Sequence, residues 1–128
     1  MKQSNFQFSN PRLLNISYNI NENFNNEEVK FSIKNEITKH FSKEKKQEAH
    51  VSLRVTLGEQ SESYPFFITL EIAAFFKVED EISDQNFNKL LDINAPAMLL
   101  SYARPIVSLI TSQSGYPAFD IPFINFTE

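Results

Sequence analysis

The fold is decided by the stretch NAPAMLLSYARPIV, residues 94–107, together with the apolar tail near the end of the chain. Apolar residues dominate this stretch, and Pro96 is tolerated because it falls in the first turn of a helix. Pro105 has no amide proton and crowds the preceding turn, so we predict a kink there. Gly115 suits a helix C-cap, and the tail reads IPFINF at residues 121–126. Together, these two segments predict a long, bent, apolar helix followed by an apolar C-terminal tail.

Four strand-like segments precede this helix. Apolar and polar residues alternate at 6–20, 29–41, 51–57 and 64–78, which is typical of strands that bury one face. Because proline cannot donate a ladder hydrogen bond, Pro11 predicts a break in the first segment and places that segment at an edge of the sheet.

Two helices are expected after the strands. Ser83 is suited to cap a short helix that carries Phe87, Leu90 and Leu91 on one side, and Asn94 is suited to cap the long helix. Consecutive strands followed by helices predict an α+β fold. We expect a four-stranded antiparallel sheet followed by a short helix and a long kinked helix, both packed on one face of the sheet.

Composition narrows the classes of function. A single domain is expected over residues 1–128, a length that can bury a sizeable core. The net charge of −4 disfavours nucleic-acid binding, the absence of cysteine fits the cytoplasm, and no apolar run is long enough to predict membrane insertion. Thirteen Phe and only two Gly favour aromatic packing over phosphate binding. We expect a cytoplasmic protein without a cofactor.

The last strand carries apolar residues on both of its faces. Its second face displays Phe67, Ala73 and Phe75 among polar neighbours. Together with the apolar side of the short helix, these residues would form a groove for extended apolar polypeptide segments. The alternative is that the same side chains pack on one another. The candidate peptide-binding residues are Phe67, Ala73, Phe75, Phe87, Leu90 and Leu91.

The long helix has more apolar surface than one sheet can cover. A single sheet with one helix layer is expected to leave the outer side of this helix uncovered. We therefore predict a homo-oligomer, a dimer or a tetramer, formed through the helix and the first strand. The candidate interface residues are Leu14, Ile16, Met98, Leu100, Tyr102 and Val107.

No set of residues predicts catalysis or a metal site. His40 and His50 flank a polar hairpin with too few further ligands for a metal, so exposed hairpin residues are the better interpretation. Arg104 with Asp92 or Asp120 is expected to make a structural ion pair that fixes the helix to the tail. Neither a nucleophile elbow nor a phosphate loop occurs. We predict that the protein is not an enzyme.

Across nearly its whole length the sequence resembles SecB, the export chaperone. The resemblance is carried by FQF at 6–8, LRVT at 53–56, the Pro96–Leu99 step, YAR at 102–104 and PFINF at 122–126, in the order that the family shows. It implies a fold in which first strands join two protomers into one sheet and long helices lie between two such dimers. The chain also resembles small SecB-like proteins of Gram-positive bacteria.

The sequence departs from the SecB pattern at two places. The family docks the export motor SecA through acidic residues on its sheet, and the matching positions here are Asn15, Asn19 and Thr69. The sequence stops at Glu128, where SecB continues into another helix and a flexible tail. The resemblance therefore does not lead us to expect docking of SecA.

Three functional hypotheses remain open on the sequence alone. The first is an ATP-independent holdase that binds exposed apolar segments of unfolded polypeptides. The second is a dedicated protein–protein interaction or assembly module on the same scaffold, without export coupling. The third, small-ligand binding or catalysis between helix and sheet, would require an enclosed cavity with converging polar groups.

Overall fold

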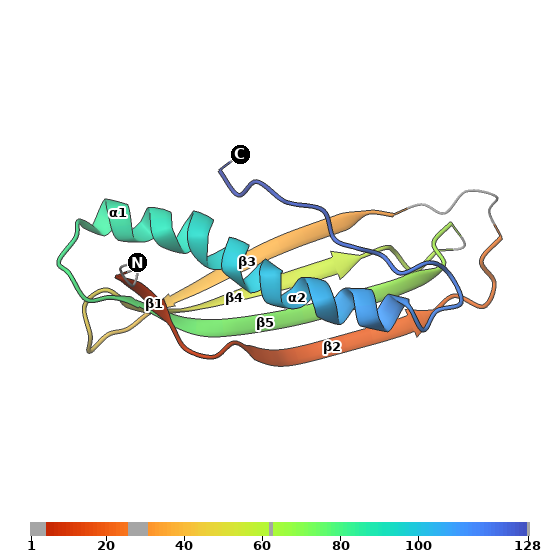
Figure 1. Cartoon of the computed structure of the whole chain (residues 1–128), viewed down its shortest axis with the longest axis horizontal. Helices are drawn as coiled ribbons and strands as arrows, with labels where there is room; N and C mark the ends of the chain where they lie inside the picture. Colours follow the sequence, from red (N-terminus) through yellow and green to blue (C-terminus); the bar gives the residue numbers. More distant parts are fainter. Residues whose placement is uncertain (1–4, 26–30, 62, 128) are drawn as a thin grey trace.

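The protein is an antiparallel sheet with one long helix across a single face, as predicted (Figure 1). The computed structural model describes residues 5–25, 31–61 and 63–127. The part of the predicted second strand at residues 29–30 lies outside these ranges. The elements are β1 (Phe6–Phe8), β2 (Arg12–Ile20), β3 (Ile33–Phe41), β4 (Glu48–Leu57), β5 (Phe66–Val78), α1 (Asp84–Lys89), η1 (Leu90–Asn94) and α2 (Ala95–Thr111).

Within the described residues, the sheet contains five strands because the first predicted strand is broken in two. Both β1 and β2 pair with β5, and Pro11 lies between them, where the sequence predicted a break. Beyond β5 come β4 and then β3, all antiparallel. Among the described strands, β1 and β2 thus form one edge of the sheet and β3 forms the other.

The strand register assigns each side chain to a face. Val51, Leu53 and Val55 of β4 pair with Ala74, Ile72 and Leu70 of β5, and these side chains face the helix and form the core. The alternating positions face away and form what we call the back face. There Arg54 pairs with Glu71 and Thr56 with Thr69. A register shift between Leu13 and Asn15 in β2, which the sequence pattern did not reveal, disturbs the alternation at Leu14.

The two predicted helices form one continuous helix. Ser83 caps α1 as expected, since its Oγ accepts a hydrogen bond from the Asn86 N–H at 3.1 Å. The prediction that Asn94 caps a separate helix is wrong, because Asn94 is itself helical and makes no side-chain cap bond. The five π-helical residues of η1 join the two parts, and Ala95 N–H donates to the Leu90 carbonyl five residues back. The predicted kink at Pro105, inside α2, stays a prediction.

By length and composition alone, the helix Asp84–Thr111 would be able to cross a membrane. In this fold one side of the helix packs on the sheet: Phe87, Leu91, Leu99, Ala103 and Val107 all belong to the core. A core helix passes the same test of length and composition, so the helix gives no independent support for membrane insertion.

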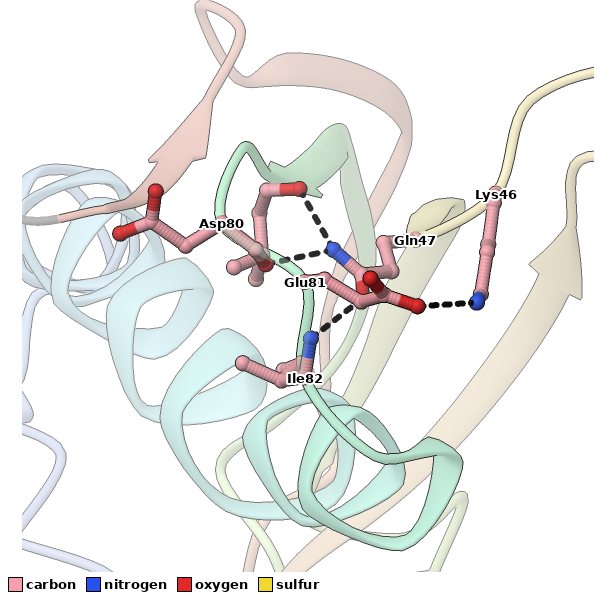
Figure 2. A network of polar contacts seen from close by, with 6 residues as sticks. Lys46, Gln47, Asp80, Glu81 and Ile82 are labelled. Atoms are coloured by element: carbon pink, nitrogen blue, oxygen red, sulfur yellow. Dashed lines mark hydrogen bonds and ion pairs between the residues drawn. The ribbon is translucent and has the colours of Figure 1, made fainter.

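One glutamine joins the β3–β4 hairpin to the connection between β5 and α1 (Figure 2). Gln47 has a positive φ of 59°, which is uncommon for a residue with a side chain. Its Nε2 donates to the carbonyls of Val78 (2.9 Å) and Asp80 (2.7 Å), and its Oε1 accepts from the Ile82 N–H at 2.7 Å. Three hydrogen bonds from one side chain therefore fix the start of the helix relative to the sheet.

After α2 the chain returns over the helix-bearing face as an extended tail, residues 117–127. It runs along α2 on the side of β3 (Figure 1). Ile121 is fully buried, and Phe119, Ile124 and Phe126 pack against the core. The Arg104 Nε of α2 donates to the Ile121 carbonyl at 2.7 Å. The tail is therefore part of the fold and covers one flank of the helix.

Candidate functional site

The two flanks of α2 differ in how well they are covered. Tyr102 and Leu109 lie two helical turns apart, so they project from the same flank. That flank faces β1 and β2, because the Tyr102 ring lies edge-on to the Phe8 ring with centroids 6.4 Å apart. Leu109 is 65% exposed. The tail contacts Arg104, on the other flank of the helix, and so leaves this flank open.

Strand β2 adds to this uncovered flank. Leu13, Ile16 and Ile20 pair with core residues of β5, so they share its helix-facing side, yet all three are exposed. We call the whole surface the open strip. It consists of Phe8, Leu13, Ile16, Ile20, Tyr102 and Leu109.

A second apolar surface lies on the opposite flank of α2, along β3. Ile37 and Phe41 face the helix side and are exposed, and the Phe41 ring packs edge-on to Phe87 at 6.1 Å between centroids. Phe31, just before β3, lies 4.4 Å from the Phe119 ring of the tail. The tail thus covers only part of this surface. We call it the β3 strip and define it as Phe31, Ile33, Ile37, Phe41 and Phe87.

The two edges of the sheet are protected to different degrees. On β3, Lys39 points toward the helix side, where its Nζ lies 2.6 Å from Asp92 of η1. Asn35 also faces the helix side, and its Oδ1 is buried without a hydrogen-bond partner. Inward-pointing polar and charged side chains hinder the pairing of an edge strand with another strand. The residues of β2 that face the helix are apolar or Tyr18, so this edge lacks that protection.

The structure divides the predicted peptide groove between the two faces of the sheet. Phe67, Ala73 and Phe75 lie on the back face, and the Phe75 ring contacts His50 there. Phe87, Leu90 and Leu91 lie on the helix side. Because the sheet separates the two sets, they do not form one groove within the protomer. The sheet equally excludes the alternative that the two sets pack on each other; Phe75 is 51% exposed, whereas Ala73 and Leu91 are buried.

The predicted interface residues also divide into two groups. Leu14, Ile16 and Tyr102 are exposed and Met98 is partly buried, so all four remain candidates for contact with another chain. Leu100 (4% exposed) and Val107 (0% exposed) are core residues, so their predicted place on the outer side of the helix is wrong. Apolar residues surround most of α2, so the sequence pattern does not distinguish its buried arc from its exposed flank.

The polar residues singled out in the sequence make structural contacts. His40 and His50 pair across the hairpin strands, and no group of metal-binding side chains occurs in the described ranges. Arg104 does fix the helix to the tail, but through the Ile121 carbonyl and the Phe123 ring. The predicted ion pair with Asp92 or Asp120 is wrong, because Asp92 pairs with Lys39 and no described salt bridge involves Arg104.

Sequence reasoning missed several members of these surfaces. Phe8, Ile37 and Phe41 are exposed on the helix side, although the strand pattern placed their parity toward a core. Leu13 reaches that side only through the register shift in β2, and Leu109 belongs to the exposed flank of α2. Counting layers would have revealed them, because one helix is too narrow to cover a sheet of this width. Exposed apolar side chains of this number are typical of an interaction surface.

A family model described as preprotein translocase subunit SecB matches residues 6–128 of the chain. The protein therefore belongs to the SecB family. An uncharacterised protein from Methanocaldococcus jannaschii is 25% identical over 93% of this chain and 78% of its own length. The protein-export protein SecB of Anaplasma phagocytophilum is 28% identical over 60% of this chain, and the match spans about half (51%) of that relative.

Solved structures share the fold of this chain. The SecB-like chaperone Rv1957 of Mycobacterium tuberculosis, solved with a ChAD peptide from the Rv1956 HigA1 antitoxin, has a TM-score of 0.72 and 16% identity, covering 94% of this chain and 88% of its own. A protein of unknown function from Streptococcus agalactiae has a TM-score of 0.55 and 12% identity, covering 92% of this chain and 97% of its own. The predicted SecB-like α+β fold is thereby confirmed.

Proposed function

We propose that this protein is a non-enzymatic, cytoplasmic holdase that binds exposed apolar segments of unfolded polypeptides without ATP. The observation that carries the proposal is the exposed apolar surface on both flanks of α2, in a member of the SecB family. The peptide in the structure of the mycobacterial relative supports a polypeptide as the ligand.

We assign client binding to the β3 strip. Phe31, Ile37 and Phe41 offer aromatic and branched side chains to an extended segment. A hollow of about 290 Å³ lies beside Phe41 and Phe87, but polar side chains of the β3–β4 hairpin and α1 form most of its lining. Client apolar surface that leaves water there would contribute roughly 25 cal/mol per Å². Because this gain depends on area, binding would require little in the way of client sequence. Phe67 and Phe75 on the back face remain a second candidate contact.

We assign the open strip to a second copy of the chain. The β2 edge has no inward charge, and the residues beside it are apolar, so strand pairing across this edge would also cover Ile16 and Tyr102. Ile16→Asp should therefore lower the mass measured in solution toward that of one protomer. Thr38→Asp, on the back face of β3, is the matched control and should leave the mass unchanged.

A second candidate function is an interaction module for one dedicated partner. The mycobacterial relative is in complex with a peptide from a single antitoxin, which favours this alternative. The positions that correspond to the acidic docking residues of SecB are Asn15, Asn19 and Thr69, so we do not assign SecA as a partner. A dedicated module would bind one folded or peptide partner in a fixed ratio and would leave unrelated unfolded chains to aggregate.

Light scattering during the refolding of an aggregation-prone client tests the proposal. A several-fold excess of the protein without nucleotide should suppress the rise in scattering. Phe41→Ser should weaken this suppression, whereas Thr38→Ser, on the opposite face of the same strand, should retain it. Unchanged aggregation at every excess would contradict the holdase function.

A further inference from the structure

We propose that the C-terminal tail, residues 117–127, is a displaceable plug that competes with clients for the β3 side of the helix-bearing face. This inference rests on the proposed function, because it assumes that the β3 strip binds clients. It adds a regulatory element, since a client would have to displace the tail to use the whole surface.

The tail already occupies this surface in the way that an extended client would. The Phe119 ring packs on the Phe31 ring with centroids 4.4 Å apart, and Ile121 is completely buried. Further along, Ile124 and Phe126 pack against the core cluster. The apolar side chains of the tail that face the fold thus form two pairs, Phe119 with Ile121 and Ile124 with Phe126, and one residue separates the members of each pair. The tail shows which kind of segment fits there.

The tail is joined to the fold by few polar contacts. Within the described part of the chain, the backbone of residues 117–127 makes two hydrogen bonds to the rest of the fold. The Phe119 N–H donates to Thr111 Oγ1 at 2.8 Å, and the Ile121 carbonyl accepts from Arg104 Nε at 2.7 Å. No strand of the sheet pairs with these described residues. Displacement would break these two bonds and the contact of the Arg104 guanidinium with the Phe123 ring, and would separate apolar contacts that a client replaces, without opening the sheet.

The tail does not cover all of the apolar surface along β3. Ile37 and Phe41 remain exposed with the tail in place. Asn35, on the same side of β3, has a buried Oδ1 with no hydrogen-bond partner. A client that covers Ile37 and Phe41 as well as the tail's positions would thus make more contacts than the tail does.

The chemistry of the tail defines the competing ligand. Residues 117–127 contain a single charged residue, Asp120, and four apolar residues that face the fold. The expected client segment is extended, weakly charged and rich in aromatic and branched residues at alternating positions. Helical segments would not match, because they place apolar residues three and four apart.

Hydrogen exchange of the full-length protein tests the plug directly. The Phe119 amide is hydrogen-bonded in the closed state, so it should exchange faster when the protein is saturated with reduced, carboxymethylated α-lactalbumin, a permanently unfolded chain. Amides of β3 should exchange more slowly in the same sample. If this probe binds and Phe119 exchange stays the same or slows, the plug is refuted while the holdase function stands. If it does not bind, both are refuted.

Weakening the tail's anchor should improve client binding. Arg104→Gln removes both the donor to the Ile121 carbonyl and the guanidinium over the Phe123 ring. It should raise the affinity for the same probe by at least about fivefold, the factor expected for the hydrogen bond alone when closed tails predominate. Thr111→Val, which removes the acceptor for Phe119, should act in the same direction. Arg54→Gln, on the back face, is the control. Equal affinities in all variants would overturn the proposal.

A peptide competition completes the test. A synthetic peptide with the sequence of residues 117–127 should displace the unfolded probe from the Arg104→Gln protein. The matched control peptide carries serine in place of the four inward-facing apolar residues and should not displace it. Equal displacement by the two peptides would contradict recognition of those side chains. The four replaced positions are Phe119, Ile121, Ile124 and Phe126.

Discussion

Replacing Ile121 by alanine tests whether the tail is part of the folded structure. Ile121 is 0% exposed, whereas Phe123, two residues on, is 93% exposed and contacts the Arg104 guanidinium at 5.1 Å from its ring centroid. Truncating a buried isoleucine to alanine costs about 2–5 kcal/mol. We expect a loss of about 2 kcal/mol, because the tail can detach and the free energy of docking the tail then limits the loss.

The expected shift is large enough to measure. For a domain of this size, about 2 kcal/mol lowers the midpoint of thermal unfolding by roughly 6–10 °C. Phe123→Ala should cost no more than about 1 kcal/mol, the upper value for an exposed cation–π contact. Urea unfolding followed by circular dichroism gives both free energies, provided that the protomer concentration is fixed, because association alters apparent stability. Equal midpoints for the two variants would refute a docked tail.

Three further substitutions test the fold. Gly58→Ala should lower the free energy of unfolding in urea by about 2–3 kcal/mol, because φ is +78° and a Cβ would lie 2.5 Å from the Phe66 carbonyl oxygen. Gly115→Ala has a φ of +87° but no atom within 4 Å of the added Cβ, so it should lower that free energy by only about 1 kcal/mol. Equal losses would refute the clash. Gln47→Met should cost about 2–3 kcal/mol by removing three hydrogen bonds, and an unchanged urea midpoint would contradict that network. Asn35→Leu should raise the unfolding free energy by about 1 kcal/mol, because it removes an unpaired buried oxygen, and a loss of stability would show that the oxygen has a partner.

Much of the sheet could be predicted from the alternation of apolar and polar residues. The parity of β4 and β5 identifies the core face directly, because a strand places successive side chains on opposite faces. Pro11 correctly indicated a break at the sheet edge, since it cannot donate to the ladder. The register shift at Leu14 was not predictable, because an extra residue leaves no mark on composition.

The helix was harder to interpret. Nearly every flank of α2 carries apolar residues, so periodicity could not distinguish the arc with Leu100 and Val107, which is buried, from the flank with Tyr102 and Leu109, which is exposed. The tail covers one flank of α2 and not the other, which accounts for part of this difference in exposure. No local sequence pattern specifies the path of the tail. The join at η1 was also hidden, because Asn94 and Pro96 together have the composition of a helix start.

The candidate site could be predicted only in its chemistry. The sequence indicated surplus apolar surface and polypeptide ligands, yet it combined Phe75 with Phe87, which the sheet keeps on opposite faces. To group these residues correctly, one must know which face of the sheet the helix covers. Alternation within one strand defines two faces but does not say which of them the following helix covers.

The central claim, that clients bind beside β3 on the helix-bearing face, is tested most directly by site-specific crosslinking. Since the chain has no cysteine, a single introduced cysteine can carry a benzophenone group at Phe41 or, as control, at Arg54 on the back face. Illumination in the presence of reduced, carboxymethylated α-lactalbumin should give a crosslinked product from the Phe41 position and little from the Arg54 position. Equal products from both positions, or none from Phe41, would contradict the account.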